Sequence, residues 1–312
     1  MKKVVVLIVT YNRKKLLVEC LNSINKQTYP ISKIIVIDNH SSDGTNKLFV
    51  NNELFNDKNI LYKRLSKNIG GAGGFYEGFK LALKMEFDWL WVMDDDTIPE
   101  SKSLELLIDD ANCVNKTNLS FIASSVFGPN HRTMNVPTIS KSTSISGYQD
   151  WYINLDKGLV KIMSATFVSL LINKDAIKKV GLPLKSYFIW GDDTEYTLRL
   201  TKYFGDAYLS GKSRVLHKRS SDSTLSLIGE DNKNRIPLYF FLIRNELINV
   251  KEYFDEKRFI LRILYWMIYS WKILISHHIS YKFKKIFIIQ KAILVILFRR
   301  YDYREFNGRL NL

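Results

Sequence analysis

The chain has 312 residues, a net charge of +15 at pH 7 and 46% hydrophobic residues. This length suits one main α/β domain with a smaller appendage, and the composition excludes a disordered, collagen-like or disulfide-stapled chain. The two cysteines, Cys20 and Cys113, stand in no CxxC or metal-type spacing, which favours a reducing compartment and inert thiols. No stretch reaches the roughly 18 uncharged apolar residues that span a bilayer.

Strand and helix patterns alternate over the first hundred residues. Val4–Val9 and Ile34–Ile37 are short β-branched runs, and the apolar residues between them recur with helical spacing. We expect a βαβ unit, with Val4–Val9 a buried strand rather than a signal sequence. Strands that alternate with helices imply a mostly parallel, doubly wound α/β sheet. Further patterns predict a helix from about Thr45, a strand over 60–65, a helix over 75–85 and a strand over 89–93.

Polar clusters stand at three places where predicted strands end. They are Asp38–Gly44, Asn68–Gly74 and Asp94–Asp96. Ligands of doubly wound sheets bind at the carboxyl ends of the strands. We therefore expect the three clusters to meet at one edge of the sheet and to form a ligand site there.

The second half of the chain has a weaker pattern. Residues 120–172 look β-like but irregular, with a Ser/Thr-rich stretch over 138–146 that predicts a loop. Residues 190–200 predict a loop that enters a helix, and helical patterns dominate the remainder of the chain. These patterns divide the chain into an α/β domain over 1–235 and a basic, aromatic-rich helical region over 236–312.

Three adjacent aspartates, Asp94, Asp95 and Asp96, follow an apolar strand pattern. Adjacent carboxylates repel one another, so a bound cation is expected, and oxygen ligands at a strand end suit Mg²⁺ or Mn²⁺. His217 is a candidate third ligand, because imidazole suits Mn²⁺ beside carboxylates. The alternatives are an acidic surface turn for the aspartates and an ordinary structural role for the histidine.

A second acidic cluster, Asp192, Asp193 and Glu195, lies far along the chain in the first turn of a predicted helix. Two carboxylate clusters in one α/β domain suggest that one holds a metal ion while the other supplies a general base. The alternative is helix capping, since carboxylates in a first turn interact favourably with the helix dipole.

The turn from Asn68 to Gly74 holds glycines at positions 70, 71, 73 and 74. It opens a predicted helix, whose N-terminus favours anions, and its glycines leave room for phosphates or a sugar. It lacks the Gly-Lys-Ser/Thr end of a Walker A loop, and it follows the third strand rather than the first, unlike a Rossmann fingerprint. The alternative is a flexible turn that needs positive φ.

Positive charge is concentrated towards the end of the sequence. Residues 235–312 hold 15 Lys or Arg against 6 Asp or Glu, interleaved with aromatic and aliphatic residues. This pattern is typical of helices at an anionic membrane surface. The alternative, which we weigh equally, is an amphipathic helical subdomain whose basic face is solvated.

These motifs in combination resemble family 2 glycosyltransferases, which have the GT-A fold. Within that family, Asn68–Phe75 and the triple aspartate are similar to galactofuranosyltransferases and their rhamnosyltransferase relatives. The resemblance covers residues 1 to about 250, including Arg244-Asn245 after an aromatic segment; Gly191 stands where galactofuranosyltransferases tend to place a tryptophan. The motifs that carry it are Thr10-Tyr11-Asn12-Arg13, Asp38-Asn39-x-Ser41-x-Asp43-Gly44-Thr45, Asn68-x-Gly70-Gly71, Asp94-Asp95-Asp96 and Trp190-Gly191-Asp192-Asp193-x-Glu195-Tyr196.

The resemblance implies a role for each matching residue. Asp94, Asp96 and His217 would hold Mn²⁺ or Mg²⁺, and Asp193 would be the catalytic base. A UDP- or dTDP-linked donor would contact Thr10, Tyr11, Asn12, Arg13, Asp38, Asn68, Gly70, Gly71 and Asp95. The candidate acceptor contacts are Trp190, Asp192 and Glu195, together with Trp151 and Tyr152, which are either stacking platforms for a sugar or core aromatics.

The combined expectation is an inverting, metal-dependent glycosyltransferase that acts on a growing cell-surface glycan, such as capsule or O-antigen, or on a lipid-linked oligosaccharide. UDP-galactofuranose is expected ahead of dTDP-rhamnose, UDP-galactose or UDP-glucose, because four glycines would give room to the exocyclic diol of a furanose. We expect a cytoplasmic, peripheral protein on the inner face of the plasma membrane, with no nucleic-acid partner. The rivals are a nucleotidyltransferase, which would not need the second acidic cluster, and a non-catalytic carbohydrate- or membrane-binding module.

Overall fold

The computed structural model describes the chain in five segments, which together form two compact units. The first unit comprises Met1–Ser186 and Asp193–Asp222, and the second comprises Tyr187–Asp192 and the chain from Ser223 onward. The domain boundary predicted after residue 235 stays a prediction, and residues 299–312 of the predicted helical region lie outside the described residues. The described segments are 1–50, 59–114, 118–219, 225–276 and 278–298.

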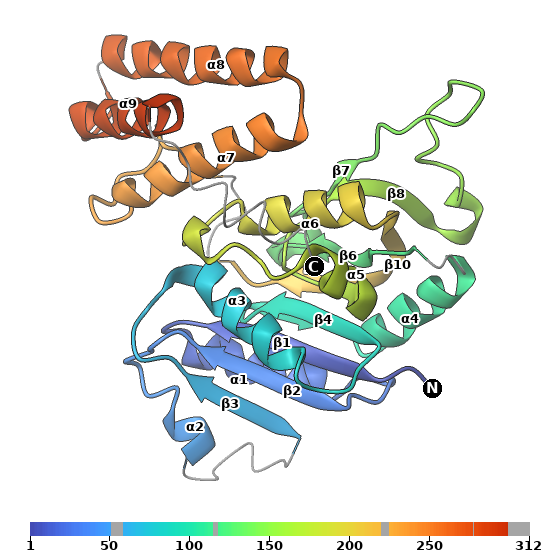
Figure 1. Cartoon of the computed structure of the whole chain (residues 1–312). Helices are drawn as coiled ribbons and strands as arrows, with labels where there is room; N and C mark the ends of the chain where they lie inside the picture. Colours follow the sequence, from blue (N-terminus) through green and yellow to red (C-terminus); the bar gives the residue numbers. More distant parts are fainter. Residues whose placement is uncertain (51–58, 115–117, 220–224, 277, 299–312) are drawn as a thin grey trace. The chain divides into compact units, whose positions relative to one another are not determined.

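The first unit begins with the predicted alternation of strands and helices (Figure 1). β1 pairs in parallel with β2 and β4, and β2 pairs in parallel with β3, which confirms the βαβ unit. Helix α3 begins at Gly70, before the start at residue 75 that the sequence predicted. The elements are β1 (Val4–Thr10), α1 (Lys14–Ile24), β2 (Lys33–Asp38), α2 (Lys47–Val50), β3 (Ile60–Arg64), α3 (Gly70–Ala82) and β4 (Trp89–Asp94).

The remainder of the first unit completes a mixed sheet with strand order β3-β2-β1-β4-β9-β6-β10-β8-β7. β9 runs antiparallel to both β4 and β6, so the sheet is parallel only in part. Strand direction leaves no mark on an apolar run of a few residues, which is why the sequence did not reveal it. The elements are β5 (Thr97–Pro99), α4 (Ser103–Val114), β6 (Phe121–Phe127), β7 (Thr138–Ile139), β8 (Leu159–Ser164), β9 (Leu170–Asn173), α5 (Lys174–Val180), α6 (Asp192–Tyr203) and β10 (Ala207–His217), with short 3₁₀ turns at Pro129–His131, Leu155–Lys157 and Lys185–Tyr187.

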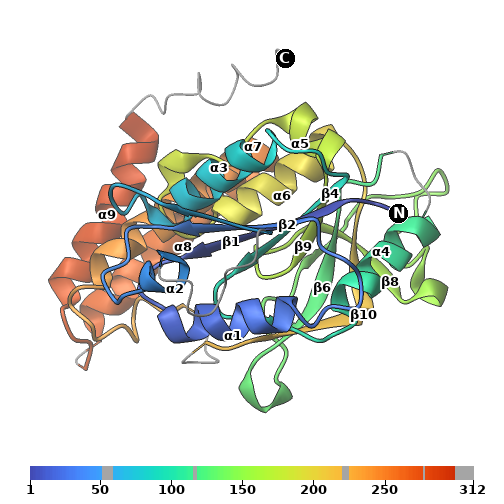
Figure 2. The ribbon, with the colours of Figure 1, turned by 90° about the horizontal axis from the view of Figure 1, so that it is seen from below.

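Helices cover both faces of this sheet (Figure 2). α1 and α4 bury their apolar side chains on one face, and α3, α5 and α6 bury theirs on the other. β1 supplies both cores, because successive side chains of a strand point to opposite faces: Val6 and Ile8 pack on one side, and Val5 and Leu7 on the other. A strand buried on both faces is expected to be apolar throughout, which explains the uninterrupted run at the start of the sequence.

Glycines let helix α3 lie unusually close to β1. A Cβ added to Gly78 would lie 2.3 Å from Leu7 Cδ1, and one added to Gly74 would lie 2.5 Å from Val9 Cγ1. A Cβ on Gly73 would meet the Ile69 side chain at 2.6 Å, whereas one on Gly71 would have no heavy atom within 4 Å. The expectation that all four glycines border a roomy ligand site is therefore wrong for Gly73 and Gly74, which serve packing.

This packing predicts opposite effects for two alanine substitutions in α3. Gly78→Ala is expected to destabilise the protein by about 1–3 kcal/mol, because the new methyl group overpacks the buried Leu7. Gly71→Ala is the matched control, which should keep or slightly raise stability because alanine favours helix more than glycine does. Urea unfolding followed by far-UV circular dichroism measures both, and equal midpoints would contradict the close-packing explanation.

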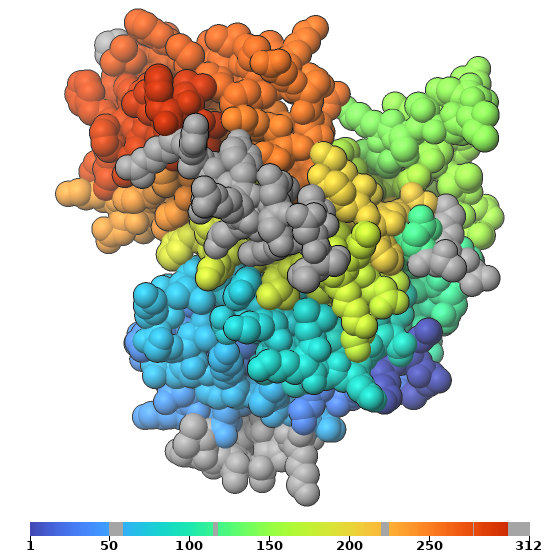
Figure 3. All heavy atoms as spheres, in the orientation of Figure 1, coloured from blue at the N-terminus to red at the C-terminus, as the bar shows by residue number. Residues whose placement is uncertain are grey.

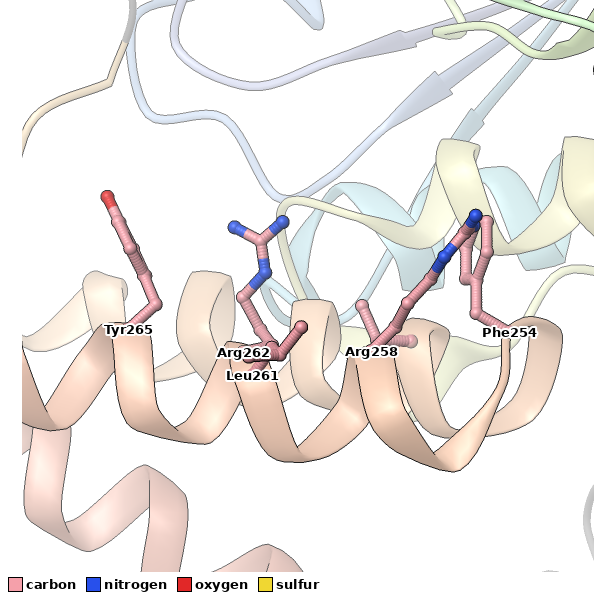
Figure 4. A pocket seen from close by; sticks show the side chains of 6 residues that line it. Phe254, Arg258, Leu261, Arg262 and Tyr265 are labelled. Atoms are coloured by element: carbon pink, nitrogen blue, oxygen red, sulfur yellow. The ribbon is translucent and has the colours of Figure 1, made fainter.

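The second unit is a helical layer of α7 (Tyr239–Tyr253), α8 (Glu256–Ile275) and α9 (Lys282–Phe298), with a 3₁₀ turn at Ile236–Leu238 before α7. Asp255 caps α8 by accepting a hydrogen bond from the Arg258 backbone N–H at 2.8 Å. A groove between α7 and α8 is lined in part by Arg258, Arg262 and Tyr265, which project from one side of α8 (Figure 4). Within the described part of the chain, no helix is both long enough and apolar enough to span a membrane.

Candidate active site

The parallel strands bring three sequence motifs to one edge of the sheet. Thr10 at the end of β1 is in register with Asp38 at the end of β2, and Val9 is in register with Asp94 at the end of β4. The sequence predicted this meeting from the positions of the polar clusters alone. The edge therefore carries Thr10, Asp38 and the aspartate triplet within one layer of strands.

His217 reaches the aspartates through the short strand β5. β5 follows the triplet directly and pairs antiparallel with the end of β10, where His217 lies opposite Thr97. The Lys218 backbone N–H donates to the Asp96 carbonyl at 2.8 Å, which fixes this register. As a result, one ligand atom from each of Asp94, Asp96 and His217 lies within 4.8 Å of the others.

The contacts of His217 fit a cation between it and Asp96. His217 Nδ1 lies 2.9 Å from Asn135 Oδ1, which orients the ring. His217 Nε2 lies 3.0 Å from the buried Asp96 Oδ1. A proton or a metal ion must lie between these two atoms, and imidazole with carboxylates is a donor set that Mn²⁺ accepts.

Burial and mutual repulsion dominate the electrostatics of the triplet. Burial, reinforced by the charges of Asp96 and Asp95, raises the pKa of Asp94 well above its usual value. Burial also raises the pKa of Asp95 to about 6, against the opposing effects of Arg13 and Thr10. Asp96 is the exception, because His217 and Arg13 outweigh burial and hold its pKa below the usual value. A cation bound to Asp94 and Asp96 would relieve the repulsion between them.

Arg13 bridges two of the aspartates. Its Nη1 donates to Asp95 Oδ1 at 3.1 Å and to Asp96 Oδ2 at 2.7 Å, while its side chain remains 49% exposed. Asp95 is almost fully buried, and its second oxygen accepts a hydrogen bond from the Thr10 hydroxyl at 2.7 Å. Asp95 thus anchors Thr10 and Arg13, and its predicted contact with the donor stays a prediction.

Asp38 also supports its neighbours. It has no exposed surface, and its oxygens accept hydrogen bonds from the Ser41 backbone N–H at 2.7 Å and the Tyr62 hydroxyl at 2.5 Å. Asp38 therefore supports the turn after β2, and its predicted direct contact with the nucleotide stays a prediction. The exposed residues of this edge are Tyr11, Asn12, Arg13 and Asn68, of which Asn12 accepts a hydrogen bond from the Ser42 backbone N–H at 2.7 Å.

Asn39 is a positioning residue that the sequence reading did not single out. Its side-chain amide donates to the Gly70 carbonyl at 2.8 Å, and its oxygen accepts from the Ile69 backbone N–H at 2.9 Å. Asn68 adds a hydrogen bond from the Gly70 backbone N–H at 2.8 Å. Gly70 has a φ of +78°, which glycine adopts without strain. Asn39 and Asn68 thus hold the turn that starts α3, and the available signal was that Asn39 directly follows the Asp38 strand end.

The second acidic cluster divides between a site residue and a structural residue. Asp193 is half-buried near Asp94, whose pKa its charge raises further. Burial raises the pKa of Asp193 itself, although the backbone N–H groups of Thr194 and Phe167 favour its charged form. Glu195 has no exposed surface and forms an ion pair with the buried Arg199 at 3.0 Å. The predicted contact of Glu195 with an acceptor is therefore replaced by a structural role in α6.

The aromatic candidates occupy two different places. Trp151 and Tyr152 pack edge-to-face, with ring centroids 5.7 Å apart, on the excursion between β7 and β8. This excursion stands out from the surface of the first unit, shown in light green in Figure 3, and Tyr152 is 55% exposed on it. Trp190 and Asp192 belong to the second unit, where the Trp190 ring lies 5.3 Å from that of Tyr239.

The order of the strands, with an acidic cluster at the carboxyl edge after β4, is that of GT-A glycosyltransferases, enzymes that take a sugar from a nucleotide donor. The sequence profile of "Glycosyl transferase family 2" matches residues 5–180, more than half of the chain, and the chain belongs to this family. Among curated relatives, Galactofuranosyltransferase GlfT1 of Mycolicibacterium smegmatis is 25% identical over 257 residues, which are 76% of this chain and 80% of that protein. GlfT1 of Mycobacterium tuberculosis is 26% identical over 204 residues, 64% of this chain and 65% of that protein.

Other relatives and solved structures extend the likeness. Abequosyltransferase RfbV of Salmonella typhimurium is 37% identical over 103 residues, but these are only 31% of this chain and 29% of that protein. S. aureus TarS 1-349 in complex with UDP-GlcNAc has a TM-score of 0.58 at 15% identity, covering 94% of this chain and 81% of that one. GalNAc-T7 with UDP, GalNAc and Mn²⁺ has a TM-score of 0.63 at 14% identity, covering 98% of this chain and 58% of that one. At such identities the structural matches establish the GT-A fold.

Proposed function

We propose that the chain is an inverting, metal-dependent glycosyltransferase in which Asp94, Asp96 and His217 hold a divalent cation and Asp193 is the general base. The observation that carries the proposal is that one ligand atom from each of Asp94, Asp96 and His217 lies within 4.8 Å of the others, with Asp96 Oδ1 3.0 Å from His217 Nε2. When bound, Mn²⁺ or Mg²⁺ would neutralise the diphosphate leaving group. A nucleotidyltransferase would not need the separate carboxylate of Asp193 near this cluster.

The chain's own residues account for donor binding and proton transfer. Tyr11, Asn12, Arg13 and Asn68 present exposed side chains for the nucleotide of a UDP- or dTDP-linked donor, and the first turn of α3 at Gly71 leaves space beside them. Asp193 takes the proton from the acceptor hydroxyl. The acceptor oxygen attacks the anomeric carbon from the face opposite the nucleoside diphosphate, and the bond from that carbon to the diphosphate breaks. The configuration at that carbon is inverted as a result.

We propose galactofuranose as the transferred sugar, from UDP-galactofuranose. The similarity to the two GlfT1 proteins supports this choice, and the shorter match to an abequosyltransferase marks a deoxy sugar as the second candidate. Of the four glycines expected to leave room for the exocyclic diol, Gly70 and Gly71 remain candidates, because Gly73 and Gly74 pack inside the first unit. We assign the acceptor, an oligosaccharide or a lipid-linked glycan, to the partly buried Trp151 and the exposed Tyr152 of the first unit. The predicted acceptor contacts of Trp190 and Asp192, in the second unit, stay predictions.

A donor panel tests both levels of this proposal. The protein with Mn²⁺ and a membrane-lipid or oligosaccharide extract is expected to release UDP from UDP-galactofuranose faster than from UDP-galactose or UDP-glucose, and faster than dTDP from dTDP-rhamnose. Faster release of dTDP would overturn the sugar and leave the enzyme class standing. Binding of UDP without turnover of any donor would favour a non-catalytic module instead.

We further propose that α8 and α9 attach the enzyme to an anionic membrane surface on the cytoplasmic side. The proposal rests on an exposed apolar stripe along α8, where Ile260, Leu264, Ile268, Trp271 and Ile275 recur at helical spacing, each at least 45% exposed. α9 adds Phe283, Phe287, Leu294 and Phe298, flanked by Lys284 and Lys291. Apolar side chains flanked by lysines are the composition of helices that lie in the membrane interface.

Flotation with liposomes checks the membrane proposal. The protein is expected to float with vesicles containing phosphatidylserine and to be released by salt, because each Lys or Arg near such a surface contributes about 1 kcal/mol. Ile268→Glu with Trp271→Glu should abolish flotation, whereas Ile145→Glu, on an exposed residue of the first unit, should not. Failure to float, combined with a dimer that the double substitution dissociates, would identify the stripe as an interface between copies of the chain.

A further inference from the structure

The loop that leads into Asp193 has a costly backbone conformation. Phe188 and Trp190 both have a φ of +62°, and Gly191 has a φ of +86°. Bulky residues rarely adopt this region, and such a conformation persists only when surrounding contacts enforce it. The contacts that enforce it here come from helix α7, in the same structural unit as the loop.

Asn245 on α7 makes the largest share of these contacts. It has no exposed surface, and its side-chain amide donates to the carbonyls of Tyr187 at 3.0 Å, Ile189 at 3.1 Å and Trp190 at 2.6 Å. Its oxygen accepts two hydrogen bonds from the Arg244 guanidinium, at 2.9 and 2.7 Å, which hold the amide in that orientation. The two amide hydrogens are therefore shared among three carbonyls of the loop, with at least one hydrogen bond bifurcated.

Asn249, one turn further along α7, completes the clamp. Its amide donates to the Gly191 carbonyl at 3.0 Å, and its oxygen accepts a hydrogen bond from the Tyr187 hydroxyl at 2.8 Å. A Cβ on Gly191 would lie 3.2 Å from the Asn245 Cβ, so the positive φ and the close approach both require glycine at this position.

We infer that Asn245 and Asn249 are positioning residues for catalysis: they fix the strained loop Tyr187–Gly191 and thereby the point at which the chain enters the helix that carries Asp193. The inference rests on the proposed function of Asp193 as the base. Gly191 is only two residues from Asp193. If the loop backbone could adopt several conformations, the position of the Asp193 carboxylate would therefore vary as well. The proposed effect is on the placement of the base, so it falls on kcat rather than on donor binding.

Substitutions that remove the clamp should slow the transfer step. Asn245→Ala is expected to lower kcat by about 10²-fold with the KM for the donor unchanged, since a misplacement of about 1 Å has that effect on an oriented catalytic group. Asn249→Asp keeps the acceptor for Tyr187 but loses the donor to Gly191, and should give a smaller loss of the same kind. Trp266→Phe is the matched control, because it removes a partly buried hydrogen bond from α8 to Glu246, a neighbour of Asn245 on α7 that, among the described residues, makes no hydrogen bond to the loop, and should leave kcat unchanged.

A double-mutant cycle with Asp193→Asn separates positioning from structural damage. If Asn245 acts through Asp193, Asn245→Ala should cause no further loss of transfer in the Asp193→Asn background, measured in single-turnover reactions. If Asn245→Ala lowered the transfer rate by the same 10²-fold factor with and without Asp193→Asn, the inference would be overturned. General damage to folding would reduce the rate by the same factor in both backgrounds. Full activity of Asp193→Asn alone would instead overturn the proposed base, so the two failures are distinguishable.

Amide hydrogen exchange supplies a readout that needs no substrate. Peptides that cover residues 187–193 should exchange faster in Asn245→Ala and Asn249→Asp than in the Trp266→Phe control, with α9 protected equally in all of them. Unchanged exchange over 187–193 in both asparagine variants would contradict the clamp. A uniform rise throughout the second unit would also contradict it, because that result indicates general destabilisation.

Discussion

Replacing Asp193 by asparagine is expected to leave nucleotide binding intact and to slow sugar transfer by about 10²–10⁴-fold, the usual effect of losing a general base. The carboxamide has the same shape, and its oxygen can still accept the hydrogen bond from the Thr194 backbone N–H that Asp193 Oδ1 accepts at 2.6 Å. It cannot take a proton from the acceptor hydroxyl. Isothermal titration with UDP and a radiolabelled transfer assay measure the two properties separately.

Asp175→Asn is the matched control for this substitution, since Asp175 is an exposed aspartate in the first turn of α5. It should bind UDP and transfer sugar as the unsubstituted chain does. Because burial raises the pKa of Asp193, activity should be lost on acidification at a higher pH than an ordinary aspartate would give, since only the deprotonated form accepts a proton. Transfer by Asp193→Asn at a near-normal rate would remove Asp193 from the mechanism.

The parallel half of the sheet was predictable because its strands are buried on both faces. β1, β2 and β4 appear in the sequence as uninterrupted apolar runs, and a turn or polar cluster closes each of them. The strands β5 and β7 have three and two residues, too few for a periodic pattern to form. β5 is nevertheless the strand that brings His217 to Asp96, so the sequence offered the histidine as a ligand by its residue type and by resemblance to the family, without showing how the two residues meet.

The sequence could not separate ligand-binding carboxylates from structural ones. A carboxylate that binds a ligand and one that holds its own neighbours look the same in a sequence, as Asp38, Asp95 and Glu195 show. Glu195 did carry a signal, because Arg199 stands four residues later and such pairs meet on one face of a helix. The sequence around Asn135 gave no such signal. Its contact with His217 depends on an irregular segment, in which Asn135 itself has a φ of +47°.

Loss of the metal site is expected to be strongly non-additive. Alanine at Asp94, Asp96 or His217 should each abolish most Mn²⁺-dependent transfer, and the double variant Asp96→Ala with His217→Ala should be no worse than Asp96→Ala alone. The reason is geometric, because the three ligand atoms lie within 4.8 Å of one another and removal of one leaves an incomplete set. Additive losses at saturating Mn²⁺ would indicate three independent contributions instead of one site.

The role of His217 is best tested by comparing the Mn²⁺ affinities of three substituted proteins. Asn135→Ala leaves the ring of His217 in place but removes the acceptor that orients it, and such outer partners typically contribute about 10–100-fold in affinity. His217→Ala should weaken Mn²⁺ binding at least as much, while His278→Ala, on an exposed histidine of the second unit, should have no effect. Titration of Mn²⁺ followed by electron paramagnetic resonance gives the three affinities without any substrate. If His217→Ala bound Mn²⁺ as tightly as His278→Ala does, the 3.0 Å approach of its Nε2 to Asp96 would be a simple ion pair of a protonated imidazole, and the metal ligands would reduce to the aspartates.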